Sequence, residues 1–98
     1  MKPRKADELS RAIKKLHVCD SSWIRSVPVT EKHEDKIVWQ GTVEVFQLLN
    51  HPSANACYAW SHAIEGSKKR RYVAVLQQPP VDSPQKAVRA AIAGKWEK

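Results

Sequence analysis

The sequence predicts a single α+β domain in which one helix precedes and another follows an antiparallel sheet of four strands. Apolar residues recur at helical spacing near both ends of the 98-residue chain, and at alternate positions between Trp23 and Leu76. Polar and proline-containing breaks divide this alternating stretch into four segments, which favours a meander. We expect both helices to pack on one face of the sheet, and residues 1–5 to form a flexible basic arm.

The first helix is predicted over residues 6–16. Acidic residues lie in its first turn and lysines in its last, which complements the helix dipole. Residues 20–22 then break the pattern. The apolar residues recur at three- and four-residue spacing, at Ala6, Leu9, Ile13 and Leu16.

Alternation with β-branched and aromatic residues predicts strands at residues 23–32, 37–48, 57–64 and 72–76. Pro28 cannot donate to a ladder, so the first strand is expected at a sheet edge. In the second strand, the odd-numbered face from Ile37 to Val45 is the better core candidate, and Gly41 favours a bulge or bend. The last two strands are expected to form a hairpin around residues 65–67.

The second helix is predicted to begin at Ser83 and Pro84, which suit the N-cap and the first helical position. Its apolar stripe runs from Val88 to Trp96, with Gly94 as the candidate stop.

The net charge is +7, and it is concentrated at the ends of the chain. Residues 1–20 hold six basic and three acidic residues, and residues 67–98 hold eight and two, whereas the middle is mildly acidic. This asymmetry favours polyanionic partners. The first eight residues are rich in charge and the apolar runs are short, so no secretory signal or membrane span is expected. Because the two cysteines are also far apart, a soluble protein in the reducing cytoplasm is expected.

Four adjacent cations, Lys68, Lys69, Arg70 and Arg71, are the leading candidate site, because a basic hairpin can neutralise phosphates whatever the base sequence. Strand alternation is expected to send them to both faces of the sheet. The alternative is a solvated turn that only keeps the protein soluble.

On the third strand, Tyr58, Trp60 and His62 share one face, while the small residues from Cys57 to Ala63 share the other. If the helices cover the small face, the aromatic row is open and bases can stack on it, as in readers of single-stranded RNA. If the helices cover the aromatic row, it is ordinary core.

Metal binding and nucleophilic catalysis have little support in the sequence. The candidate metal ligands form no closed zinc site: they are His17, Cys19, His33, His51, Cys57 and His62. His51 or His62 could in principle activate Cys57, but no oriented base or electropositive niche is evident. No cofactor motif is present.

The order of elements resembles the double-stranded RNA-binding domain, and residues 83–91 are similar to its last helix in the spacing of small residues. That family places a lysine-rich cluster at this helix start, whereas here only Lys86 and Arg89 are basic, and a fourth strand is expected. The chain is therefore not assigned to the family.

The sequence-based hypothesis is a non-enzymatic nucleic-acid-binding module, with RNA ahead of DNA and no membrane or metal partner. A protein-interaction or self-assembly module is the alternative, and a small cysteine-dependent enzyme is the third.

Overall fold

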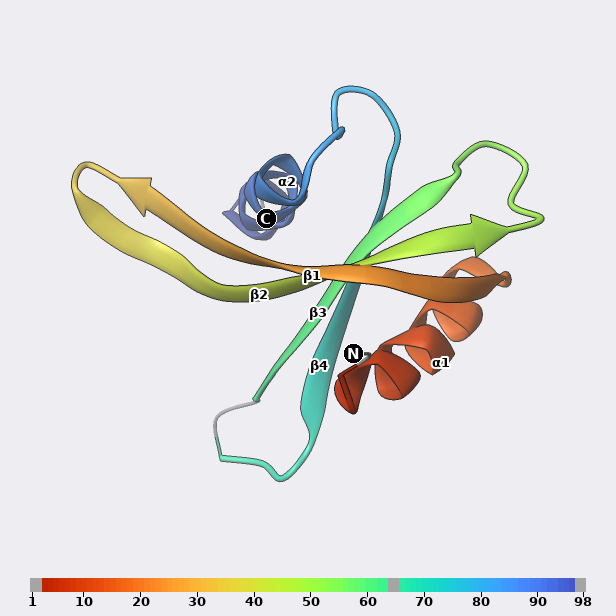
Figure 1. Ribbon diagram of the computed structural model, residues 1–98. Helices are drawn as coiled ribbons and strands as arrows, with labels where there is room; N and C mark the ends of the chain where they lie inside the picture. The colour runs from red at the N-terminus through yellow and green to blue at the C-terminus, as the bar shows by residue number, and fades with distance from the viewer. Residues whose placement is uncertain (1–2, 64–65, 97–98) are drawn as a thin grey trace.

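The computed structural model describes residues 3–63 and 66–96, without the side chains of residues 63 and 93–96. All strands pair antiparallel in one sheet of order β1-β2-β3-β4, which confirms the predicted α-β-β-β-β-α meander (Figure 1). Of the predicted N-terminal arm, Lys5 already belongs to a helix, and residues 1 and 2 lie outside the described part. The elements are α1 (Lys5–His17), β1 (Asp20–His33), β2 (Lys36–Leu49), β3 (Ala56–Ala63), β4 (Arg70–Leu76) and α2 (Pro84–Trp96).

The two helices lie on opposite faces of the sheet, so the expectation that they share one face is wrong (Figure 1). Helix α1 packs over Cys57 and Ala59 of β3, and α2 packs over the alternate residues Tyr58 and Trp60. Because strand residues alternate between faces, an apolar run such as β3 makes both faces of the sheet hydrophobic. Each face then needs its own cover, and one helix supplies it on each side.

Helix α1 is fixed to both edges of the sheet. The Ser10 and Ser21 hydroxyls lie 3.0 Å apart at the β1 side, and Nε2 of His17 lies 3.0 Å from the Ala74 carbonyl oxygen of β4. The helix ends at Val18, which has a left-handed backbone (φ 55°) and donates its N–H to the Lys14 carbonyl.

Helix α2 begins as predicted. The Lys86 N–H donates to Oγ of Ser83 over 3.2 Å, which is the expected N-cap bond. The helix continues through Gly94 to Trp96, so Gly94 does not end it. Glu31 of β1 fixes it to the sheet, because its carboxylate accepts hydrogen bonds from Gln85 and, over 2.8 Å, from Arg89.

The sheet consists of two hairpins that cross. Strands β1 and β2 pair along almost their whole length, whereas β2 pairs with β3 only over residues 44–47. The far ends of both hairpins therefore project from the body of the protein (Figure 1). Pro28 lies on the edge strand, as expected. The pairing is irregular at Trp23/Arg25 and Glu31/Lys32 but regular at Gly41, where a Cβ would come within 3.0 Å of the Trp39 ring.

One carboxylate is buried in the sheet. Glu44 of β2 is 2% exposed, and its Oε1 accepts hydrogen bonds from Nε1 of Trp23, over 2.9 Å, and from the Ser26 hydroxyl. These two donors compensate part of the cost of removing a carboxylate from water.

Candidate nucleic-acid interface

The four predicted cations lie at the projecting end of the β3–β4 hairpin. Lys68 and Lys69 belong to the turn, Arg70 and Arg71 begin β4, and all four side chains are exposed. Gly66 has a left-handed backbone (φ 78°), which glycine adopts without strain. The Lys69 N–H then donates to Oγ of Ser67 over 3.1 Å, which orders the turn that presents the lysines.

The two arginines of β4 point to different faces of the sheet, as strand alternation predicts. Arg70 lies on the α1 face, where its Nε and Nη2 donate to Oγ and the carbonyl oxygen of Ser61 over 3.0 and 3.1 Å. Arg71 is paired in register with the exposed His62 and lies on the α2 face. The cations therefore surround the hairpin rather than forming a single row.

Tyr58 and Trp60 are not available for stacking, so the prediction of an open aromatic row is wrong for these two residues. They are 3% and 4% exposed beneath α2, and the Trp60 ring meets Trp39 edge to face with the centroids 5.7 Å apart. Burial also raises the pKa of Tyr58. These side chains are core residues, and of the predicted row His62 lies at the surface.

Helix α1 and its N-cap residue add four exposed cations that the prediction of a hairpin site did not include: Arg4 at the N-cap, and Lys5, Arg11 and Lys15 within the helix. Arg4, Arg11 and Lys15 are separated by seven and four residues, so they share the outer stripe of the helix. The signal for them was already in the sequence, in the basic excess of residues 1–20.

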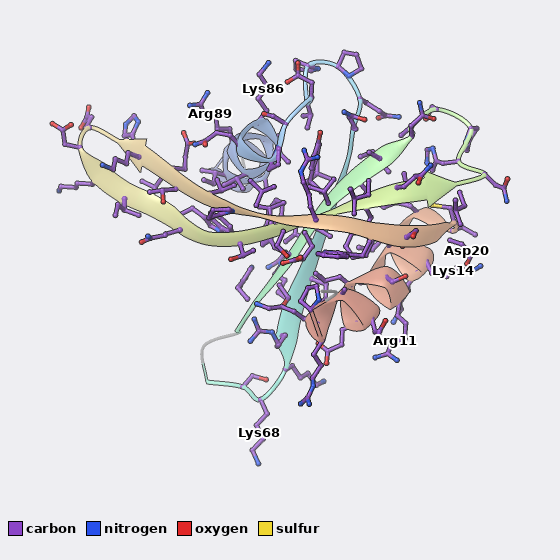
Figure 2. All side chains as sticks on the ribbon, viewed as in Figure 1. Arg11, Lys14, Asp20, Lys68, Lys86 and Arg89 are labelled. Carbon is purple, nitrogen blue, oxygen red and sulfur yellow. The ribbon has the colours of Figure 1, made fainter. Side chains whose placement is uncertain are left out.

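These helical cations lie on the same side of the molecule as the hairpin end. Figure 2 shows Arg11 on the outer side of α1 and Lys68 at the end of the hairpin that projects past this helix. The Tyr72 hydroxyl of β4 lies 3.5 Å from Oε2 of Glu8, which joins the first half of α1 to the hairpin. We call these exposed side chains the basic surface: Arg4, Lys5, Arg11, Lys15, Lys68, Lys69, Arg70 and Arg71.

Three cations outside the basic surface are held in ion pairs, whereas Arg25, Lys32 and Lys36 of the β1–β2 hairpin are exposed and join no described carboxylate. On the other side of the sheet, Lys86 lies 3.0 Å from Asp82 and Arg89 lies 2.8 Å from Glu31. Lys14 of α1 pairs with Asp20 over 2.9 Å. Between residues that the structure describes, no ion pair joins the basic surface to a carboxylate. Its positive charge is therefore available to an external anion.

The cysteines have the properties of core residues. Cys57 is fully buried, and burial raises the pKa of its thiol to about 12, with a smaller effect from Cys19. A thiol with this pKa is almost entirely protonated at neutral pH and is a poor nucleophile. Within residues 3–63 and 66–96, no three His, Cys, Asp or Glu residues are grouped so as to hold a metal ion.

Comparison with known proteins finds no matching family model, no similar curated protein and no similar solved structure. None of the described helices is both long enough and apolar enough to cross a membrane. The function must therefore be argued from the site itself.

Proposed function

We propose that this chain is a non-enzymatic nucleic-acid-binding module that holds the phosphate backbone with its basic surface. The observation that carries the proposal is the gathering, on the outer side of α1 and around the end of the β3–β4 hairpin, of exposed cations that pair with no described carboxylate. Phosphates bound there release their condensed counterions, and this release favours binding whatever the base sequence. The sequence-based preference for RNA depended on Tyr58 and Trp60. Their burial leaves phosphate contacts, which RNA and DNA both offer.

A titration of labelled RNA and DNA, at about 50 mM and about 200 mM salt, tests the proposal. The test variant replaces Lys68, Lys69 and Arg71 with Gln, and keeps Arg70 because its guanidinium holds Ser61. The matched control also removes three exposed cations, but from the β1–β2 tip and α2: Lys32, Lys36 and Lys86.

We expect binding that weakens steeply with salt, a large loss in the test variant and a small one in the control. Since both variants change the net charge equally, a difference between them locates the binding surface. The absence of salt-sensitive binding at low salt, or an equal loss in both variants, would overturn the proposal.

A cytoplasmic location is part of the proposal. Cys19 and Cys57 are both buried and free. Free thiols are the usual state of cysteine in a reducing compartment. Fluorescent tagging and fractionation of cells that express the protein would test this location.

A protein-interaction or self-assembly module is the second candidate function. Large apolar side chains are exposed near the start of β1 and the end of β2: Leu16 at 55%, Val18 at 82%, Ile24 at 46% and Leu49 at 43%. Exposed apolar groups of this kind are typical of protein contact surfaces. Light scattering across a range of concentrations distinguishes the functions. A dimer that Val18→Glu dissociates favours assembly, and a monomer at all concentrations removes self-assembly.

A further inference from the structure

The structure also indicates which form of nucleic acid the basic surface takes. We infer that its ligand is a double helix, held through the phosphates of both strands, rather than a single strand. This inference rests on the proposed function and goes beyond it, because phosphate binding alone does not distinguish a duplex from a single strand.

The first observation is that both faces of the sheet are covered. Helix α1 packs on the face with Cys57 and Ala59, and α2 packs on the face with Tyr58 and Trp60. Proteins that bind single strands commonly stack bases on exposed aromatic rings, which offsets the cost of ordering a flexible chain. Among the Phe, Trp and Tyr side chains that the structure describes, Tyr72 is the one that is exposed, at 37%. The sheet therefore offers no row of rings for successive bases.

The second observation is the length over which the cations of the α1 stripe are spaced. Arg4 and Lys15 are eleven residues apart on one outer stripe, which corresponds to about 16 Å along the helix axis. B-DNA carries one phosphate charge per ~1.7 Å of its axis, so several phosphates face a stripe of this length. A double helix holds these phosphates in place before binding, so a helical backbone that fixes the spacing of the cations needs to order its side chains but not the ligand.

The third observation is that a second element, the β3–β4 hairpin, carries cations near this stripe. The Glu8 to Tyr72 contact and the His17 to Ala74 contact both tie α1 to β4, which begins directly after the turn that carries Lys68 and Lys69. Two fixed sets of cations suit two strands of phosphates that face each other across a groove. A flexible single strand would have to be ordered along both sets, and the surface offers its successive bases no row of aromatic rings in return.

Contacts limited to phosphates also predict that binding is independent of base sequence. Duplex DNA and duplex RNA share the phosphate chemistry but differ in groove shape, since the A-form major groove is deep and narrow. Both duplexes therefore belong in the test, and their relative affinity shows which groove width the two sets of cations span.

The decisive experiment is a competition measurement on the intact protein at about 100 mM salt. The competitors are duplexes of about 20 base pairs, in DNA and in RNA, and unstructured single strands of equal length. Two duplexes of unrelated sequence test independence of sequence. A variant with Arg4, Arg11 and Lys15 replaced by Gln, and the hairpin variant above, test each element separately.

We expect at least one duplex type to bind about tenfold more tightly than its single strands, and equally in both sequences. Each variant should lower the salt slope for duplex DNA by about 3, at roughly 0.9 for each phosphate that the variant no longer neutralises. Single strands that bind as tightly as duplexes, or a hairpin variant that alone loses affinity, would overturn the duplex inference and leave the proposed function standing. If the protein bound neither duplex DNA, duplex RNA nor a single strand of either kind, both the duplex inference and the proposed function would be refuted.

Discussion

Replacing Trp60 with Ala tests whether the aromatic row of β3 is core or binding surface. Trp60 is 4% exposed and packs in one cluster with Val43 and Val88, beside the Trp39 ring. A tryptophan buries at most about 250 Å², which at roughly 25 cal/mol per Å² corresponds to about 6 kcal/mol. Measured deletions of core aromatic residues cost about 3–5 kcal/mol. We therefore expect Trp60→Ala to lower the free energy of unfolding by about 4 kcal/mol.

Urea unfolding followed by circular dichroism measures this loss. A domain of this size has a total stability of about 5–15 kcal/mol, so Trp60→Ala removes a large part of it and a milder variant is needed beside it. Trp60→Phe keeps most of the apolar volume and should cost about 1–2 kcal/mol while leaving nucleic-acid affinity unchanged. If Trp60→Ala stayed within about 1 kcal/mol of the wild type and lost nucleic-acid affinity, the assignment of this row to the core would be wrong.

Three further predictions concern the thiol of Cys57, the end of α1 at Val18, and the hydrogen bonds that Glu31 accepts from α2. Because burial raises the pKa of Cys57 to about 12, its contribution to stability is complete below about pH 9 and is lost as the pH rises, by at most about 4 kcal/mol. Cys57→Ala should flatten the alkaline decline in urea titrations, and rapid alkylation of native Cys57 at neutral pH would contradict its burial. Val18→Gly should raise the free energy of unfolding by about 1 kcal/mol, because glycine adopts the left-handed backbone of Val18 without strain and the valine side chain, 82% exposed, contributes little packing. A lower melting temperature for this variant would argue against backbone strain at Val18. Hydrogen bonds from Gln85 and then from Arg89 lower the pKa of Glu31, so its contribution is present above its unfolded pKa and is lost as the pH falls. Glu31→Gln should lower the free energy of unfolding by about 1 kcal/mol at neutral pH, a small value because the Arg89 side chain is largely exposed. In acid, where the Glu31 carboxyl is protonated, the substitution should have no effect. An equal loss at both pH values would show that the charge of Glu31 is not the cause.

The elements of this fold were predictable because each is encoded in a local pattern. The three-to-four spacing of Ala6, Leu9 and Ile13 marks the buried stripe of α1, and all three are fully or almost fully buried, whereas Leu16, the fourth predicted member, is 55% exposed at the end of the helix. Pro28 correctly predicted an edge strand, and Ser83 correctly predicted the N-cap of α2.

The placement of the helices was not predictable in the same way. The pattern of β3 shows two apolar faces, one with small and one with large side chains, but it does not show which helix crosses which face. That choice depends on long-range packing, and it determined that Tyr58 and Trp60 are buried. Gly41 is a related case, since what it accommodates is the ring of Trp39, whose position depends on Trp60.

The proposed binding surface was half predictable. Four adjacent cations at residues 68–71 are conspicuous in the sequence, whereas those of α1 are interrupted by acids and apolar residues. Only the folded helix separates Arg4, Arg11 and Lys15 from its buried stripe and places them beside the hairpin. The folded structure therefore adds the cations of α1 to the charge cluster of the hairpin that the sequence shows.

The measurement that tests the central claim most directly is the salt dependence of duplex DNA binding by three proteins: the wild type, the hairpin variant and the control that lacks Lys32, Lys36 and Lys86. We expect log K to fall steeply with log salt for the wild type and the control, and the slope of the hairpin variant to be smaller by about 3. Equal slopes for the two variants, or a wild type that shows no salt-dependent binding, would contradict the claim that the basic surface holds phosphates.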